Sequence, residues 1–119
     1  MIITDEVLLD EFRTPGHCEL CGCKVRRREP HHIFTKGSGR LDVRLNLLAV
    51  CPIFSCGCNC HYQEHFYSRY TRLELIAIAA KREGVPTDTA EAILHTLRRL
   101  PKDATDEQIS RALSGGFIE

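Results

Sequence analysis

The sequence contains no tryptophan, only one methionine and no long apolar run. No apolar segment approaches the length of a membrane-spanning helix, so we expect no membrane partner. The opening residues, MIITDEVLLDEF, lack the basic start and apolar core of a signal peptide. The first 70 residues alternate short apolar stretches with glycine, cysteine and charge. Because such a segment buries little apolar surface, we expect a bound metal to contribute to its folding.

The chain has seven cysteines, an odd number that excludes a complete set of intramolecular disulfides. Without a secretion signal, the expected location is the reducing cytoplasm, where clustered cysteines are more often metal ligands than disulfides. The formal net charge is zero, but residues 13–72 carry ten Lys and Arg against four acidic residues. This basic middle segment is typical of a surface that binds a polyanion such as nucleic acid.

Local patterns predict two parts. Residues 1–70 should form the core with the strands, and residues 71–119 should form a helical extension. We expect a short helix over 4–13 capped by Thr4, strands around 24–28, 31–34 and 45–51, and a helix from Cys60. The sequences TRLE (71–74) and TDEQ (105–108) match capping boxes, and DTAE (88–91) starts a further helix between them. In the first of these helices Leu73 belongs to the expected apolar stripe.

Cysteine spacing predicts a structural zinc site. Cys18 and Cys21, separated by two residues, form a metal knuckle, and Cys60 is placed at the start of a helix. For the fourth ligand we favour Cys51, at the end of an apolar strand; Cys56, which requires a shorter loop, is the alternative, and Cys58 is too close to Cys60 in sequence. The cysteines left over, Cys23 among them, are expected to be free thiols.

The histidines form a second constellation. His61 and His65 are four residues apart on the predicted helix, so both imidazoles can reach one ion. His31 and His32 are neighbours on an extended segment, and their side chains should point to opposite sides. This arrangement favours one histidine on a metal and the other free to accept a proton.

The stretches PHHIFTKGSGRLDVRLNLLAVC and CHYQEH together resemble the HNH endonuclease motif, and CELC resembles the zinc knuckle of many members. The resemblance covers about residues 18–66. It implies an α+β fold with a small zinc-stapled ββα-metal core, here followed by a C-terminal helical extension. It also implies metal-dependent hydrolysis of phosphodiester bonds in DNA. Small HNH proteins of this kind often resemble proteins encoded by phages. If this chain is phage-encoded, it would act in the host cytoplasm.

Carried over to this sequence, the resemblance implies that His32 is the general base and that Asn46 pins the loop that orients it. His31, His61 and His65 would hold one divalent cation: Mg²⁺, Mn²⁺, Ni²⁺ or Zn²⁺. Three imidazoles favour a transition metal over Mg²⁺. Because Cys60 directly precedes His61, the His61 side chain could instead point away and leave His65 as the helical ligand.

Four cations near the histidine pair are the candidates for phosphate contacts, namely Arg27, Lys36, Arg40 and Arg44. The C-terminal helices could cover the core, meet a protein partner or form a homodimer. Two other functions fit parts of the same pattern. One is a non-catalytic zinc-binding module for nucleic acid or protein, and the other is a thiol redox or metal-sensing protein based on CGC and CGCNC.

Overall fold

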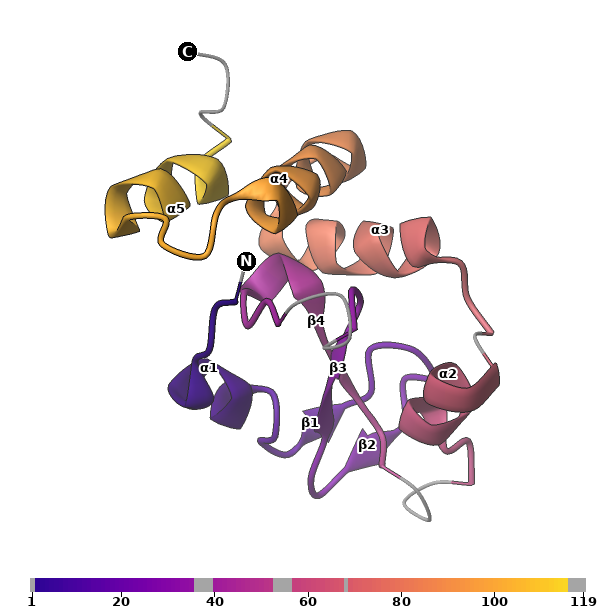
Figure 1. Cartoon of the computed structure of the whole chain (residues 1–119). Coiled ribbons are helices and arrows are strands. Elements are labelled where there is room, and N and C mark those ends of the chain that lie inside the picture. The colour runs from indigo at the N-terminus through magenta and orange to yellow at the C-terminus, as the bar shows by residue number, and fades with distance from the viewer. Residues whose placement is uncertain (1, 36–39, 53–56, 68, 116–119) are drawn as a thin grey trace.

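The structure is a computed structural model that describes residues 2–35, 40–52, 57–67 and 69–115; in the third range the side chains of residue 62 and residues 65–67 are not described. Its described part is an α+β fold in which two small antiparallel sheets are flanked by helices (Figure 1). Within these ranges no helix combines the length and apolarity that a membrane span requires.

The N-terminal segment places a helix before a small hairpin. Helix α1 (Glu6–Glu11) is followed by β1 (Gly16–His17) and β2 (Lys24–Val25), which pair antiparallel. The predicted cap Thr4 is wrong: Asp5 is the N-cap, and its carboxylate accepts a hydrogen bond from the Leu8 amide at 3.0 Å. A charged acceptor at this position interacts favourably with the helix dipole, which a hydroxyl does less well.

The central antiparallel pair consists of β3 (Glu29–His32) and β4 (Leu47–Val50), with His31 opposite Leu48 and His32 opposite Leu47. All four residues of β4 are buried. A short 3-10 helix, η2 (Arg44–Asn46), leads into β4. The strand expected over 24–28 is interrupted instead, because β2 ends at residue 25 and β3 starts before Pro30.

The remaining regular elements of the described residues are helices. They are α2 (Cys60–Tyr67), α3 (Arg72–Glu83), α4 (Thr87–Arg99) and α5 (Asp106–Leu113). Both predicted capping boxes are confirmed, at Thr71 for α3 and at Thr105 for α5. Helix α3 ends at Gly84, whose φ of 75° is the left-handed conformation that favours glycine.

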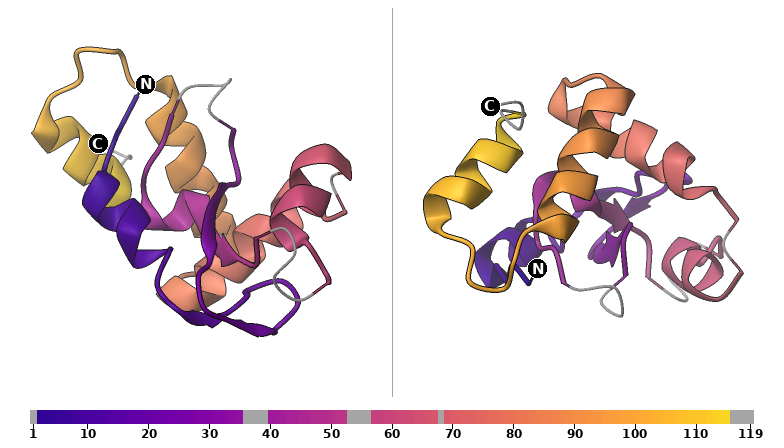
Figure 2. Two further views of the ribbon diagram at one scale, coloured as in Figure 1. Left: turned by 90° about the horizontal axis from the view of Figure 1, so that it is seen from below. Right: turned by 45° about the horizontal axis from the view of Figure 1, so that its top comes forward.

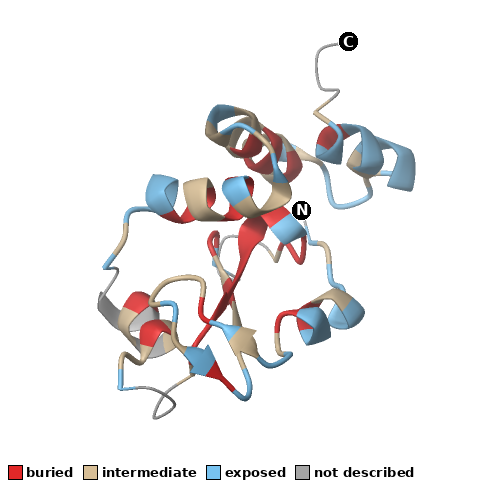
Figure 3. Ribbon diagram, turned by 180° about the vertical axis from the view of Figure 1, so that it is seen from behind, coloured by how far each residue is buried: buried red, intermediate tan, exposed pale blue. Residues whose placement is uncertain are grey.

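One cluster of buried residues extends from Cys18 in the knuckle to Ala112 in α5. Helices α3, α4 and α5 therefore share a core with the strands, and α3 packs on η2 and β4 (Figures 2 and 3). Leu73, expected in the stripe of α3, is 52% exposed, and Leu75 is buried in its place. Helix α3 packs on β4 and α4, and its buried residues are Leu75, Ile76, Ala79 and Ala80, so the buried stripe includes Leu75 and not Leu73.

Candidate metal centre and catalytic cleft

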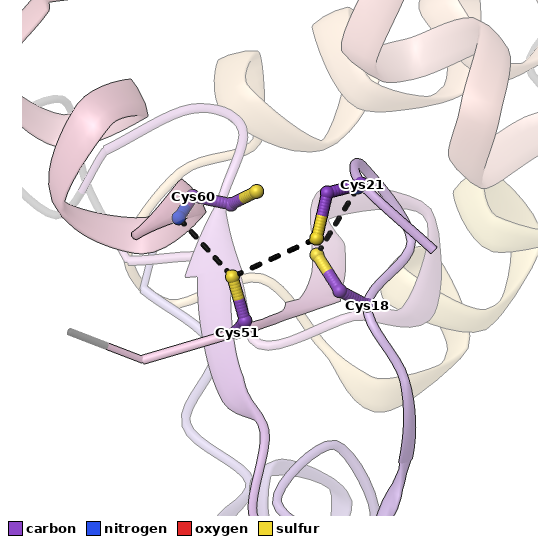
Figure 4. A group of neighbouring side chains, drawn as sticks. All are labelled: Cys18, Cys21, Cys51 and Cys60. Carbon is purple, nitrogen blue, oxygen red and sulfur yellow. Dashed lines mark hydrogen bonds between the residues drawn. The ribbon is translucent and has the colours of Figure 1, made fainter. Parts of the chain in front are cut away.

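Four cysteines from three separate segments meet beside the start of α2 (Figure 4). Cys18 and Cys21 come from the turn between β1 and β2, Cys51 follows β4, and Cys60 begins α2. Their sulfur atoms all lie within 4.8 Å of one another. Sulfurs bound tetrahedrally to one Zn²⁺ at about 2.3 Å lie about 3.8 Å apart. The distance of 3.9 Å between the Cys21 and Cys51 sulfurs matches this value.

Backbone amides donate to two of these sulfurs. The Leu20 amide donates to Cys18 Sγ at 3.3 Å. The Cys21 amide donates to the same sulfur at 3.4 Å, and the Cys60 amide donates to Cys51 Sγ at 3.2 Å (Figure 4). Gly22, with φ 78°, turns the chain after Cys21 so that its amide reaches the Cys18 carbonyl. Such N–H···S hydrogen bonds stabilise thiolates, which are the form that binds metal.

The thiols influence one another's acidity. Burial raises the pKa of the Cys21 thiol, but hydrogen bonds with the Cys23 backbone and with neighbouring thiols outweigh burial and lower this pKa to about 6. Burial raises the pKa of the Cys60 thiol, and hydrogen bonds with Cys51, Cys21 and Cys18 raise it further. A group of close thiols thus releases one proton readily and resists losing the next, and a bound cation removes this resistance.

The structure thus brings Cys51 to the predicted ligands Cys18, Cys21 and Cys60, whereas the alternative, Cys56, lies outside the described residues. A second group was not expected. The sulfurs of Cys23 and Cys58, with that of Cys21, also lie within 4.8 Å of one another.

A cleft of about 930 Å³ lies between β3, α2 and the start of α3, and three of the predicted histidines line it: His31, His32 and His61. The rings of His31 and His61 meet edge to face with centroids 5.5 Å apart. Two imidazoles bound through nitrogen to one tetrahedral ion at about 2.1 Å have centroids about 5 Å apart. His61 therefore faces the cleft although Cys60 belongs to the thiol cluster. The side chain of His65 is outside the described residues.

The neighbouring His32 takes part in a buried dyad. Its Nε2–H donates to Asp42 Oδ1 at 2.7 Å, and this carboxylate is fully buried. Arg40 donates to both oxygens of Asp42, and the Asp5 amide donates to Oδ2. Burial raises the pKa of Asp42, but the hydrogen bonds from Arg40, His32 and Asp5 outweigh it and lower this pKa. A carboxylate only accepts, so Asp42 fixes the proton of His32 on Nε2 and leaves Nδ1 as the acceptor.

Asn46 is fully buried at the end of η2 and holds the loop between β3 and η2. Its Oδ1 accepts from the Phe34 amide at 2.7 Å, and its Nδ2 donates to the Phe34 and Leu41 carbonyls. This loop contains Asp42, so the hydrogen bonds of Asn46 position the partner of His32.

Glu64, one helical turn after His61, is only 6% exposed and lines the cleft. Its Oε1 accepts a hydrogen bond from the Tyr70 amide at 3.2 Å, which fastens the connection between α2 and α3. Its Oε2 is buried, and no described residue forms a hydrogen bond with it. Glu64 thus lines the same cleft as His31 and His61, and a buried carboxylate oxygen is a donor type that can bind a cation.

Among the described residues, the cations that line the cleft are Arg13, Arg69 and Arg72, while Arg27, Arg40 and Arg44 do not line it. Arg40 pairs with Asp42 and Glu6, and Arg44 pairs with Glu83 and Glu11. Arg27 pairs with Glu29. Lys36 lies outside the described residues.

The sequence interpretation missed Asp42, Glu64, Arg69 and Arg72. Asp42 carried one usable signal, since it is the only acid in the basic stretch from residue 30 to residue 63. His95 is half-buried, and its ring centroid lies 5.6 Å from that of Phe34.

Comparison with known proteins gives no relative. No family model matches the chain, and no curated protein or solved structure matches it significantly.

Proposed function

We propose that this chain is a metal-dependent endonuclease with a zinc-stapled HNH-type ββα core, which hydrolyses phosphodiester bonds in DNA. The observation that carries the proposal is the convergence of His31, His32 and His61 in one cleft. The chain order of the elements around it, β3, β4 and then α2, is the order that the HNH resemblance implies.

The cleft offers a donor set that suits a divalent transition metal. His31 and His61 would hold the ion, with His65 as the third imidazole ligand and the buried Oε2 of Glu64 as an oxygen donor. The bound cation would stabilise negative charge on the phosphoryl and leaving oxygens. Mn²⁺, Ni²⁺ and Zn²⁺ fit this set better than Mg²⁺, which prefers oxygen ligands.

His32 is the general base of the proposed reaction. Its Nε2–H donates to Asp42, so Nδ1 carries the lone pair that accepts a proton from water. The ionised Asp42 then stabilises the imidazolium that forms, as the aspartate of a Ser-His-Asp triad does. Asp42 is a positioning residue here because it acts through His32.

The four thiols at Cys18, Cys21, Cys51 and Cys60 would hold a structural Zn²⁺. This ion would tie the knuckle and the end of β4 to the first residue of α2. Because His61 follows Cys60 directly, the same ion would fix the position of His61 in the cleft.

Arg69 and Arg72 would contact the phosphates of the substrate. Arg69 is exposed at the cleft, and Arg72 stacks on Phe34 with its guanidinium carbon 4.4 Å from the ring centroid. Stacking reduces the rotamer freedom that a phosphate contact would otherwise cost. Such contacts give affinity and position rather than sequence preference.

The test is cleavage of supercoiled plasmid DNA by the purified chain and by a His32→Ala variant, with Mg²⁺, Mn²⁺, Ni²⁺ or Zn²⁺ added in turn. His95→Ala is the matched control, because His95 does not line the cleft. We expect metal-dependent nicking that the His32→Ala change abolishes and the His95→Ala change preserves. If the folded, zinc-bound chain binds DNA without cutting it under any metal, the function is that of a non-catalytic zinc-binding module.

A further inference from the structure

The second group of thiols shares one member with the proposed zinc site. Cys21 belongs to both groups, while Cys23 and Cys58 belong only to the second. All three side chains are partly exposed, in contrast to the buried Cys18, Cys51 and Cys60. A metal ion can therefore reach the second group from solvent after the first site has formed.

A thiolate bound to one metal keeps lone pairs that can bind a second, so Cys21 can bridge two ions. The sulfurs of Cys23 and Cys58 lie within 4.8 Å of the sulfur of Cys21, the same limit that holds for the four-cysteine group. Adding a divalent cation together with two more thiolates leaves the net charge of the cluster unchanged. Formation of the second site therefore adds no net charge to the cluster, and so no repulsion between unbalanced charges.

We propose that Cys21, Cys23 and Cys58 form a second thiolate site for Zn²⁺ or a similarly soft divalent ion, joined to the structural zinc through the Cys21 sulfur. The described residues supply three thiolates, and the fourth position of a tetrahedral ion would take water or a further ligand. The inference rests on the proposed structural zinc, but it does not depend on nuclease activity.

The second ion would join the segment before β2 to the segment before α2. Cys23 immediately precedes β2, and Cys58 precedes the first residue of α2 by two positions. Asn59 lies between Cys58 and Cys60, and its φ of 49° is uncommon for a residue other than glycine. This backbone turn separates two cysteines that are too close in sequence to bind one ion easily, and it lets each belong to a different group.

The test uses Cd²⁺ as the probe, added to the reduced, metal-free full-length chain. Thiolate-to-cadmium charge-transfer absorbance counts only ions bound by sulfur, so the histidine cleft does not contribute. We expect the absorbance to saturate at two equivalents of Cd²⁺, and ¹¹³Cd NMR to show two resonances coupled through the shared sulfur. In a Cys23→Ser/Cys58→Ser variant we expect one equivalent and one resonance.

Saturation at one equivalent in both proteins would overturn the second site and leave the structural zinc in place. Two equivalents in both would also overturn it, because the second ion would then bind elsewhere. No thiolate-bound ion in the wild-type chain would refute both sites. If the double variant does not fold, the two coupled resonances of the wild-type chain still test the proposal.

Discussion

Replacement of Asp42 by Asn tests the buried dyad. The Asp42 carboxylate is fully buried and accepts hydrogen bonds from His32, Arg40 and the Asp5 amide. An Asn side chain has the same shape, but it must direct an NH₂ group at one set of these donors. At least one buried donor then loses its acceptor, and the Arg40 charge loses its buried partner.

The magnitude follows from these losses. A buried donor left without an acceptor costs about 1–3 kcal/mol, and a broken buried ion pair costs about 3–5 kcal/mol. Arg40 retains 25% side-chain exposure, and water and Glu6 compensate it in part. We therefore expect Asp42→Asn to lower the free energy of unfolding by about 3 kcal/mol.

The assay is urea unfolding of both proteins at pH 7 and at pH 3. The pKa of Asp42 is lowered in the folded state, so its stabilisation is present above the unfolded pKa of about 3.9 and is lost as the pH falls through the folded value. The difference between wild type and variant should thus shrink in acid. Equal unfolding midpoints at pH 7 would refute the dyad as a stabilising element.

A nuclease assay separates positioning from stability. If Asp42 fixes the tautomer of His32, the Asn variant should lose about 10³–10⁴-fold in cutting rate while still folded, by analogy with serine-protease triads. Glu83→Gln is the matched control, since Glu83 is also held by two arginines. It should reduce stability and leave the cutting rate unchanged.

Three further predictions concern other parts of the molecule. Asn46→Ala removes three buried hydrogen bonds to the loop and should lower the free energy of unfolding by about 2–4 kcal/mol in chemical denaturation, whereas a change below 1 kcal/mol would contradict its pinning role. A strong chelator, or Cys51→Ser, should abolish or sharply reduce the cooperative thermal transition, and an unchanged transition would argue against a structural zinc. Arg69→Ala/Arg72→Ala should weaken DNA binding and reduce its salt dependence by about two phosphate contacts, while Arg44→Ala, outside the cleft, should not.

Local interactions were predictable because the residues involved are close in sequence. The capping boxes at Thr71 and Thr105 follow from a hydroxyl and an acceptor three residues apart, which is a spacing of one helical turn. The knuckle of Cys18 and Cys21 follows from a spacing that fits one tight turn. The alternation of a strand likewise separates the rings of His31 and His32, which contact His61 and Asp42 respectively.

Predictions from the sequence were wrong where two nearby residues suited the same role equally well and the tertiary structure selected one of them. Thr4 and Asp5 both suit an N-cap, and Asp5 takes the position; its amide is also bound to Asp42, 37 residues away. Leu73 and Leu75 both suit an apolar stripe, and only packing against β4 and α4 decides which is buried. The phosphate contacts predicted at Arg40 and Arg44 stay predictions; in the structure both residues pair with acids of the chain, which their position near the histidines did not indicate.

The sequence by itself determined the α+β class, the capping of the later helices, and the residue types that can bind metal, because composition, period and short spacings act within a few residues. Only the tertiary structure decided which side chains meet. It joined Cys51 to the knuckle, Asp42 to His32, and the arginines at 69 and 72 to the cleft. Those contacts join segments separated by connections whose paths depend on how the whole core packs, which no local pattern records.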